Sequence, residues 1–383
     1  MGLVFINYPL ETFTPTQSGA IATWIWECCQ AAKQDGCEPT VISQRCAAIS
    51  YPWSRLILLD YPRLPRQRFF LKVLRAQKKL TGWRHMRQGL YVQRVLSAIR
   101  YYDLESHCFV LHNDPETVVY LRQRLPKAKI LHWFHNQMDV PQKLQKAFCG
   151  GVNSVAAVSE FTARFQERDL GFSRDQVHVV YNGVDLENFR PVDEREESGI
   201  PVINFLGRTG IEKAPDLLLK SALLLSEKTR NFSIQLLGSN HWDRIEMDAY
   251  QDELGRLCRA LESKGILVRR PGHIPRDRVA VELRKADINV VPSRWDEPFG
   301  LTVLEGMASG LATIASRTGG IPEVVGDAAL TFERESAEGL AEHLNFLISD
   351  KDARRNFAKR ARCRAEHFSW KKTWRQVSEL SDG

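Results

Sequence analysis

The chain has 383 residues, of which 43% are hydrophobic and 26% are charged, and its formal net charge is +7. This length favours two domains, each large enough for its own core, and the composition is ordinary for a globular protein. No apolar run approaches the roughly 18 residues of a membrane span. The eight cysteines show no paired C-x-x-C spacing, which argues against a zinc site or a disulfide framework and fits a reducing cytoplasm.

Strands alternate with helices along both halves of the chain. In the first half the predicted strands are residues 3–7, 40–43, 109–112, 129–134, 152–158 and 177–180. In the second half they are residues 202–206, 233–237, 266–269, 288–291, 312–315 and 329–332. Repeated strand–helix units with short loops predict an α/β fold with two doubly wound parallel sheets, whose ligands bind beyond the carboxyl ends of the strands.

A strongly basic segment lies within the first half. Residues 51–100 carry twelve Lys and Arg against one acid, Asp60, a net charge of +11. Aromatic and aliphatic residues such as Phe69 and Trp83 are interleaved with the cations, so residues 63–87 predict a basic amphipathic helix. Three interpretations stay open: a solvated helix face, a surface for an anionic membrane or a lipid-linked acceptor, and, less favoured, a surface for nucleic acid.

The most informative stretch, residues 292–305, follows the apolar run at 288–291. Pro298 and Gly300 predict a turn, and from Thr302 the apolar spacing is helical. Glu297 in the loop and Glu305 about one turn inside the helix can then face a ligand at the helix N-terminus, where free amides and the helix dipole favour anions. This arrangement suits a sugar joined to a phosphate.

Several motifs together resemble the retaining family-four glycosyltransferases of the GT-B fold. They are the Glu-x7-Glu pattern with Pro-Phe-Gly-Leu inside it, Ala308-Ser309-Gly310, Gly319-Gly320-Ile321-Pro322-Glu323, residues 204–208 with Glu212-Lys213, and residues 180–185. The resemblance is dense from about residue 155 to 335 and sparse before about residue 105.

The resemblance implies two Rossmann-like domains facing each other across a cleft. Residues 1–191 would form the acceptor-side domain and residues 200–360 the nucleotide-sugar-binding domain. Residues 361–383 would form a last helix that packs back on the first domain. The polar, non-periodic stretch at 191–199 is the predicted linker.

The donor site is assigned first from its chemistry. Fixed cations and amides near the diphosphate stabilise the departing negative charge. Arg208 and Lys213 follow a strand that ends in Gly207, so we expect them at the diphosphate. The amides at the start of the next helix complete the diphosphate site; these are Gly300, Leu301 and Thr302.

The two glutamates are expected to have separate roles. An ionised carboxylate can accept two hydrogen bonds at once, so Glu305 is expected to bind the ribose hydroxyls. Glu297 is expected to face the transferred sugar, and Phe299 lies in the same donor loop.

The resemblance also assigns residues in the first domain. It implies that His135 contacts the donor sugar, whereas a lone histidine is more often structural. It implies that Gly19 lies near the donor phosphate, although this chain has Gly-Ala where many relatives have Gly-Gly. His112 could line the acceptor side, but an N-cap by Asn113 or Asp114 before Pro115 explains that stretch equally well.

We expect no metal cofactor. The one Asp-x-Asp sequence, Asp350-Lys351-Asp352, lies in a charged turn and is expected to cap a helix. Retention, as the resemblance implies, then means attack on the face that the leaving group departs from, with the departing phosphate taking the acceptor proton.

The expected function is that of a retaining hexosyltransferase. It would move a sugar from a UDP or GDP sugar to a hydroxyl of a glycan, lipid-linked or small-molecule acceptor, in the cytoplasm or peripherally at the inner face of the membrane. One alternative is another GT-B enzyme, such as a nucleotide-sugar epimerase or a phosphorylase, although no signal for a pyridoxal lysine is visible. Another is a non-catalytic nucleotide-sugar-binding protein, which the presence of both glutamates disfavours.

Overall fold

The computed structural model describes residues 1–16, 19–60, 86–192, 199–239 and 249–382. Residues 61–85, which hold most of the predicted basic helix, and residues 193–198 of the predicted linker lie outside this range. Among the described helices, none combines the length and the apolarity that crossing a membrane would require.

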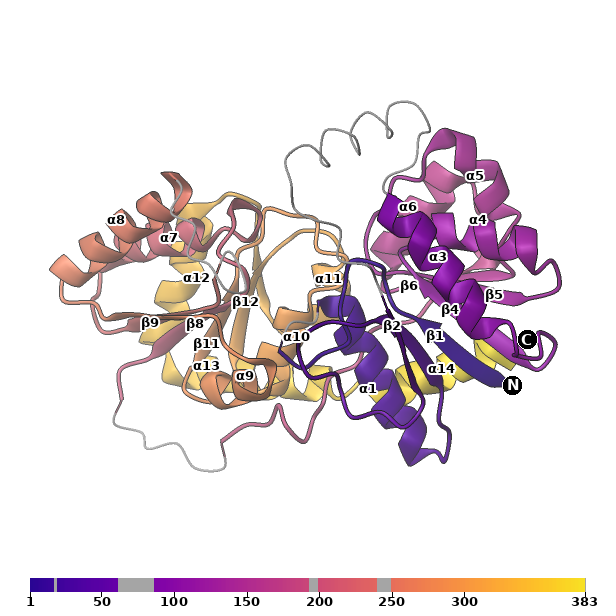
Figure 1. Cartoon of the computed structure of the whole chain (residues 1–383). Coiled ribbons are helices and arrows are strands. Elements are labelled where there is room, and N and C mark those ends of the chain that lie inside the picture. The colour runs from indigo at the N-terminus through magenta and orange to yellow at the C-terminus, as the bar shows by residue number, and fades with distance from the viewer. Residues whose placement is uncertain (17–18, 61–85, 193–198, 240–248, 383) are drawn as a thin grey trace. The chain divides into compact units, whose positions relative to one another are not determined.

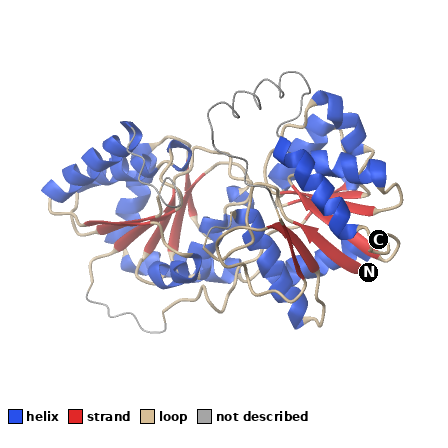
Figure 2. Ribbon diagram, in the orientation of Figure 1, coloured by secondary structure: helices blue, strands red, loops and turns tan. Residues whose placement is uncertain are grey.

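The chain forms two compact units, which are described separately. Unit 1 comprises residues 1–158, 162–180 and 373–383, and unit 2 comprises residues 159–161 and 181–372. Residues 181–191 and 361–372 therefore group with unit 2, and the domain limits inferred from the sequence stay predictions. Each unit contains one parallel sheet with helices, so the two predicted doubly wound α/β sheets are confirmed (Figures 1 and 2).

Unit 1 is built on a seven-stranded sheet in the order β3-β2-β1-β4-β5-β6-β7. Its strands are β1 (Gly2–Ile6), β2 (Thr40–Gln44), β3 (Leu56–Leu59), β4 (His107–His112), β5 (Lys129–Phe134), β6 (Ser154–Ala157) and β7 (Val177–Val179). Its helices are α1 (Ala20–Gln34), α3 (Met86–Ile99), α4 (Pro115–Arg124), α5 (Gln142–Cys149), most of α6 (Glu160–Leu170) and, from Thr373, α14 (Trp370–Asp382). The inner strands are buried along nearly their whole length, as expected for a parallel sheet covered on both faces.

Unit 2 is built on a six-stranded sheet in the order β10-β9-β8-β11-β12-β13. Its strands are β8 (Val202–Leu206), β9 (Ser233–Leu237), β10 (Val268–Gly272), β11 (Ile288–Val291), β12 (Ala312–Ser316) and β13 (Leu330–Phe332). Its helices are α7 (Pro215–Ser226), α8 (Ala249–Ser263), α9 (Arg276–Leu283), α10 (Leu301–Ala308), α11 (Ile321–Val325), α12 (Ala337–Ser349) and α13 (Lys351–Ala365). The core is apolar and includes Phe205, Leu218 and Ile314.

A buried row of amide side chains crosses the centre of the unit 2 sheet. Gln235 on β9 donates to Asn204 on β8 (Nε2 to Oδ1, 3.0 Å), and Asn204 donates to Asn289 on β11 (Nδ2 to Oδ1, 2.9 Å). Asn289 in turn donates to the carbonyl of Thr302 in the first turn of α10, at 3.2 Å. These buried polar groups are satisfied only in this pairing of the strands, so they specify its register.

The two ends of unit 2 meet each other. The backbone N–H of Val184 donates to the carbonyl of Phe368 at 3.1 Å, and Val184 forms an isolated parallel bridge with Ser369. Gly183 allows this close approach, because a Cβ there would lie 2.2 Å from the backbone nitrogen of Trp370.

In both sheets the strand order reverses next to the first strand. β1 lies between β2 and β4, and β8 lies between β9 and β11. Ligands of doubly wound sheets bind beyond the carboxyl ends of the strands at this reversal. In unit 2 the reversal falls between Gly207, after β8, and Pro292, after β11.

The sequence prediction missed one strand. β3 has only four residues, Leu56–Leu59, and forms one edge of the unit 1 sheet. Leu56–Leu59 has no alternation of apolar and polar residues, so periodicity alone does not identify it as a strand. Asp114 is the N-cap of α4 and accepts from the backbone N–H of Thr117 at 3.1 Å, so the capping interpretation of residues 112–115 is confirmed.

His132 is a fully buried histidine in β5. Its Nε2 accepts a hydrogen bond from the backbone N–H of Asp114 at 3.1 Å, and its ring packs edge-on against Phe134 and Phe148. Burial, and secondarily the neighbouring His135, lower the pKa of His132 to about 3. The ring is therefore neutral near neutral pH, as its acceptor role at Nε2 requires.

We predict that His132 makes the protein acid-sensitive. Its folded pKa lies below its unfolded pKa of about 6.5, so stability from this group is present above that value and is lost as the pH falls toward the folded pKa. Between pH 7 and pH 5 the loss is about 2 kcal/mol. In urea unfolding at both pH values, His132→Gln, whose Oε1 can still accept from Asp114, should lose about 2 kcal/mol less than the wild type on acidification.

The matched control is His367→Gln, since His367 is exposed and its Nδ1 contacts the carbonyl of Cys363. This variant should keep the wild-type difference between the two pH values. An unchanged pH dependence in His132→Gln would contradict the neutral buried ring.

Candidate functional site

Two loops meet where the strand order of unit 2 reverses. Lys213 ends the loop that follows β8, and Glu297 lies in the loop that follows β11. Lys213 Nζ lies 2.6 Å from Glu297 Oε1, and the hydroxyl of Ser293 donates to the same oxygen at 2.8 Å. The residues assigned separately to the diphosphate and to the sugar are therefore direct partners.

This ion pair is suited to an anionic ligand. Glu297 is only 7% exposed, so its charge requires a partner, which Lys213 supplies. An ammonium group has three donors and can hold Glu297 while donating to a second anion. The Lys213 side chain, at 25% exposed, remains accessible to such an anion.

The two loops are also joined through their backbones. The carbonyl of Glu212 accepts hydrogen bonds from the backbone N–H groups of Arg294, at 2.9 Å, and Trp295, at 3.1 Å. Glu212 belongs to a single 3-10 turn, Ile211–Lys213. The turn that carries Lys213 is thus fixed to the loop that carries Glu297.

Arg208 has more freedom than Lys213. Its side chain is 64% exposed, and its Nη2 lies 3.3 Å from Glu212 Oε1. An exposed ion pair of this kind contributes little to stability, so a phosphate can replace the carboxylate at small cost.

Helix α10 begins at the same site. Its N-cap, Gly300, has a φ of +96° and no side chain to cap the helix, and Leu301 and Thr302 follow in the first turn. Amides of a first helical turn have no intrahelical acceptor, so they can bind an anion. Gly319 packs against this loop, because a Cβ on it would lie 2.1 Å from the carbonyl oxygen of Glu297.

Phe299 acts on this loop from within the core. Its ring is 2% exposed and packs against Tyr181 and Phe368, with ring centroids 6.1 and 5.9 Å away. The buried ring therefore anchors the loop that follows β11.

Glu305 has a partner that the sequence did not reveal. Its side chain is 3% exposed and is paired with the guanidinium of Arg276, which also lies over the ring of Phe189 at 5.2 Å. Arg276 starts α9 and is 29 residues before Glu305, so no local pattern links them. A carboxylate can accept further hydrogen bonds beside this one, which leaves capacity for hydroxyl groups.

In unit 1, His135 directly follows β5. Its Nε2 lies 2.9 Å from Nδ1 of His112, and its backbone N–H donates to Asn113 Oδ1 at 2.9 Å. Burial lowers the pKa of His135 to about 3, and burial followed by the two neighbouring imidazoles lowers the pKa of His112. Both rings are neutral near neutral pH, so one ring nitrogen donates and the other accepts.

Gly19 is the N-cap of α1, and the sequence missed its neighbour Glu11. The Glu11 carboxylate accepts a hydrogen bond from the backbone N–H of Ala22 at 2.9 Å, and a Cβ on Gly19 would collide with it. Burial raises the pKa of Glu11, and hydrogen bonds from the amides of Ala22, Ile21 and Gly19 oppose this effect. A carboxylate of the chain itself therefore occupies the helix terminus that was expected to meet the donor phosphate.

Within the described residues, no cluster of three or more His, Cys, Asp or Glu side chains has the arrangement of a metal site. Asp350 caps α13 by accepting from the backbone N–H of Ala353 at 2.8 Å, so the capping role expected for the Asp-x-Asp sequence is confirmed.

Comparison with known proteins gives similarity over both halves of the chain. The spore coat protein SA of Bacillus subtilis is 26% identical over 313 residues, which is 75% of this chain and 81% of the relative. The lipopolysaccharide 1,2-N-acetylglucosaminetransferase of Salmonella typhimurium is 25% identical over 98% of this chain and 97% of its own. The D-inositol 3-phosphate glycosyltransferase of Corynebacterium glutamicum is 34% identical over 54% of this chain, which spans about half of that relative's length (51%).

Solved structures share the fold over nearly the whole chain. A glycosyltransferase from Rickettsia africae has a TM-score of 0.73 at 18% identity and covers 99% of this chain, with 97% of its own chain matched. The Anabaena protein HepE, solved in complex with UDP, has a TM-score of 0.71 at 16% identity, with 99% of each chain covered. These similarities show the GT-B fold.

Two family descriptions match successive parts of the chain: "Glycosyltransferase Family 4" over residues 21–188 and "Glycosyl transferases group 1" over residues 188–364. Together with the fold, they show that the chain belongs to the retaining family-four glycosyltransferases, which transfer a sugar from a nucleotide-sugar donor to an acceptor.

Proposed function

We propose that this enzyme uses a UDP-sugar and that its donor site is the pair of loops after β8 and β11. The observation that carries this proposal is the contact of 2.6 Å between Lys213 Nζ and Glu297 Oε1. A cation and a carboxylate that meet at one point support a diphosphate site beside a sugar site. The choice of UDP is supported by HepE, which was solved with UDP and with UDP-glucose.

In this proposal, different residues of the site bind the diphosphate, the ribose and the transferred sugar. Lys213 and Arg208 hold the diphosphate, and the amides of Gly300, Leu301 and Thr302 receive its remaining charge. Glu305, oriented by Arg276, accepts from the ribose hydroxyls, and Glu297 accepts from hydroxyls of the transferred sugar. The loop is anchored by Phe299.

The transfer itself needs the charge of the leaving diphosphate to be stabilised. Arg208 and Lys213 supply positive charge and the helix amides supply hydrogen-bond donors, so no metal ion is required in this proposal. The C–O bond between the sugar and the diphosphate breaks as the acceptor oxygen bonds to the same carbon on the same face. The acceptor proton passes to the departing phosphate.

The proposed roles of His135 and Gly19 rest on the family resemblance. His135 is neutral and hydrogen-bonded to His112, so it would offer a polar but uncharged group to the sugar. For Gly19, the Glu11 carboxylate at the α1 terminus means that a phosphate could bind there only by displacing it.

A two-step experiment tests the proposed donor. UDP-sugars and GDP-sugars are first screened for thermal stabilisation, which rises with the ratio of ligand concentration to dissociation constant. The stabilising sugars are then assayed for release of free nucleotide, with and without a chelator. We expect stabilisation by UDP-sugars and release of UDP that resists the chelator. Stabilisation by GDP-sugars alone would overturn the choice of UDP. Loss of UDP release with the chelator would overturn the claim that no metal ion is required.

The diphosphate assignment predicts a selective loss of affinity in Arg208→Ala. Losing a hydrogen bond to a charged group should weaken UDP by about 1.5 to 3 kcal/mol, or about 10- to 150-fold, and leave uridine nearly unaffected. Calorimetry with both ligands measures this. Arg256→Ala, which removes an exposed arginine from α8, is the control and should change neither affinity. Equal losses for UDP and uridine would contradict the assignment.

The two glutamates should separate kinetically. Glu305→Gln should mainly raise the dissociation constant of the donor, because the ribose contact is weakened. Glu297→Gln should mainly lower kcat with donor affinity kept. Both effects are measured by steady-state kinetics and by UDP binding. The control is Glu333→Gln, because the Glu333 side chain is exposed. The reverse pattern would contradict the assigned roles.

We further propose a lipid-linked acceptor and peripheral contact with an anionic membrane. The support is the charge of residues 51–100 in the sequence and the lipopolysaccharide named for the Salmonella relative. In flotation at low salt, the chain should bind anionic but not neutral vesicles, and high salt should release it because exposed charges are screened. Reversal of Arg66, Lys72, Arg75, Lys78 and Lys79 to Glu should abolish binding and spare donor hydrolysis. Failure to bind anionic vesicles would leave a soluble acceptor.

A further inference from the structure

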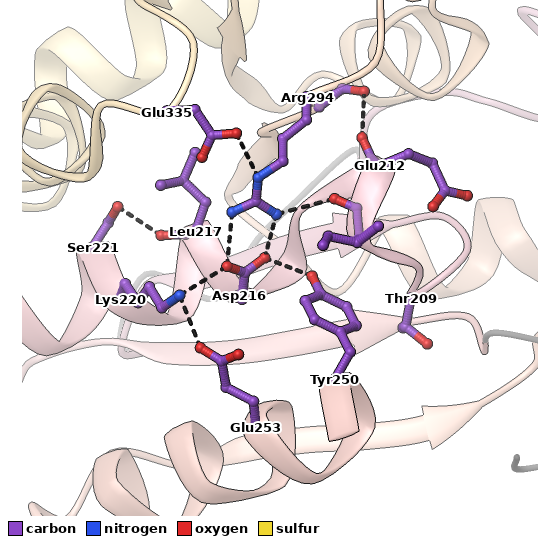
Figure 3. A network of polar contacts seen from close by, with 12 residues as sticks. Thr209, Glu212, Asp216, Leu217, Lys220, Ser221, Tyr250, Glu253, Arg294 and Glu335 are labelled. Atoms are coloured by element: carbon purple, nitrogen blue, oxygen red, sulfur yellow. Dashed lines mark hydrogen bonds and ion pairs between the residues drawn. The ribbon is translucent and has the colours of Figure 1, made fainter. Parts of the chain in front are cut away.

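A network of polar contacts surrounds the carboxylate of Asp216, in the first turn of α7 (Figure 3). Arg294 donates to both carboxylate oxygens, from Nη1 to Oδ1 at 2.7 Å and from Nη2 to Oδ2 at 2.8 Å. The hydroxyl of Tyr250 donates to Oδ1 at 2.5 Å, and Lys220 Nζ donates to Oδ2 at 3.0 Å. The Asp216 side chain is 3% exposed, and its charge is fully compensated by these donors.

The network joins four segments of unit 2. Asp216 lies on α7, Tyr250 on the first turn of α8, and Arg294 in the loop after β11. Arg294 Nε also donates to Glu335, in the segment between β13 and α12, at 2.6 Å. Figure 3 shows the Arg294 side chain reaching across to Asp216 from the loop above it.

Arg294 is also bonded to the turn that carries Lys213. Its Nη1 donates to the carbonyl of Ile211 at 3.0 Å, and its backbone N–H donates to the carbonyl of Glu212 at 2.9 Å. Arg294 itself stands three residues before Glu297. A single residue therefore ties the turn of Lys213 to the loop of Glu297 at two points.

Asp216, Arg294 and Tyr250 keep their protonation states near neutral pH. Burial would raise the pKa of Asp216, but hydrogen bonds from Arg294, Tyr250 and Lys220 outweigh it and hold the pKa well below its usual range. The hydrogen bonds to Asp216 raise the pKa of Arg294, and burial followed by the bond to Asp216 raises the pKa of Tyr250. The donors and the acceptor keep fixed roles, so the geometry is constant.

A stabilising role alone does not account for this arrangement. Buried ion pairs contribute little net stability, because desolvation offsets the attraction between the charges. The guanidinium fork, however, fixes direction as well as distance, and a lysine cannot replace it at a bidentate site. What the fork adds here is the bond to Ile211, which bears directly on the position of Lys213.

We propose that Arg294, oriented by Asp216 and Tyr250, is a positioning residue that sets Lys213 against Glu297 for the donor diphosphate. This inference rests on the proposed function of those two residues. Arg294 itself does not touch the donor; it acts by holding the turn at Ile211–Lys213.

The central test is Arg294→Lys, which keeps the charge and loses the fork. Calorimetry with UDP and uridine should show UDP affinity lowered at least about tenfold, the scale of one charge-assisted hydrogen bond, with uridine affinity and binding stoichiometry kept. A purely structural role would instead lower the stoichiometry, because fewer molecules fold, and would leave the affinity of those that do unchanged. That outcome would overturn the proposal.

Two further variants test whether this loss of UDP affinity is specific to the Arg294 network. Tyr250→Phe keeps the ring and loses one donor to Asp216, so it should fold and should lower UDP affinity in the same direction as Arg294→Lys, by a smaller factor. The matched control is Arg122→Lys, because Arg122 belongs to unit 1 and also bonds through several guanidinium nitrogens, from Nε to the carbonyl of Gly151 at 2.8 Å and from Nη2 to Asn153 Oδ1 at 2.7 Å. It should leave UDP affinity within about twofold. Unchanged UDP affinity in Tyr250→Phe, or an equal loss in the control, would count against the proposal.

A double-mutant cycle separates this inference from the proposed function. If Arg294 acts through Lys213, Arg294→Lys should have less than about a threefold effect on UDP affinity once Lys213 is replaced by Met. Full additivity would show that Arg294 acts independently and would overturn the inference. If Lys213→Met alone leaves UDP affinity unchanged, it is instead the proposed function that fails.

Discussion

The buried row of amides Gln235, Asn204 and Asn289 is the interaction on which the donor half of the molecule depends. It fixes β9, β8 and β11 in register and continues to the carbonyl of Thr302 in α10. Apolar side chains would pack in several registers, whereas unsatisfied amides in a core cost about 1–3 kcal/mol each, so only one pairing is stable. With the register set, the loops after β8 and β11 leave the sheet side by side. The geometry of the proposed donor site follows from where these two loops leave the sheet.

Two levels of constraint then act on the loops. The sheet brings Lys213 and Glu297 into the same region although they are 84 residues apart. The hydrogen bonds of Arg294 and of the Glu212 carbonyl then restrict how the two loops can move relative to each other. Fixed dipoles and charges stabilise a leaving group better than groups that must first reorient, so rigidity of this kind is directly useful for transfer chemistry.

The sequence predicted twelve of the strands because each is an apolar run bounded by turn residues, a local property. It proposed Glu297, Glu305, Arg208 and Lys213 for the donor site because they follow strands and belong to motifs of the family, and the structure brings Lys213 and Glu297 into contact. It missed the contacts that depend on distant partners: Arg276 with Glu305, Asp216 with Arg294, and Glu11 with the start of α1. Charged residues such as these look like ordinary surface positions until the fold places their partners beside them.

The meeting of the two ends of unit 2 has a consequence for the entropy of folding. Unit 1 contains both β1 and the last helical residues, from Thr373 onward, and the ends of the chain lie near each other in it (Figure 1). The amino group of Met1 lies 3.0 Å from the Asp382 carboxylate. In the sequence, residues 181–372 of unit 2 lie between these parts as one contiguous insertion. Within unit 2, Val184 is hydrogen-bonded to Phe368, so the two ends of this insertion lie close together. An insertion whose ends are bonded in this way acts as a short loop, so bringing residues 373–382 to the rest of unit 1 costs less entropy than closing an unstructured loop of the same length.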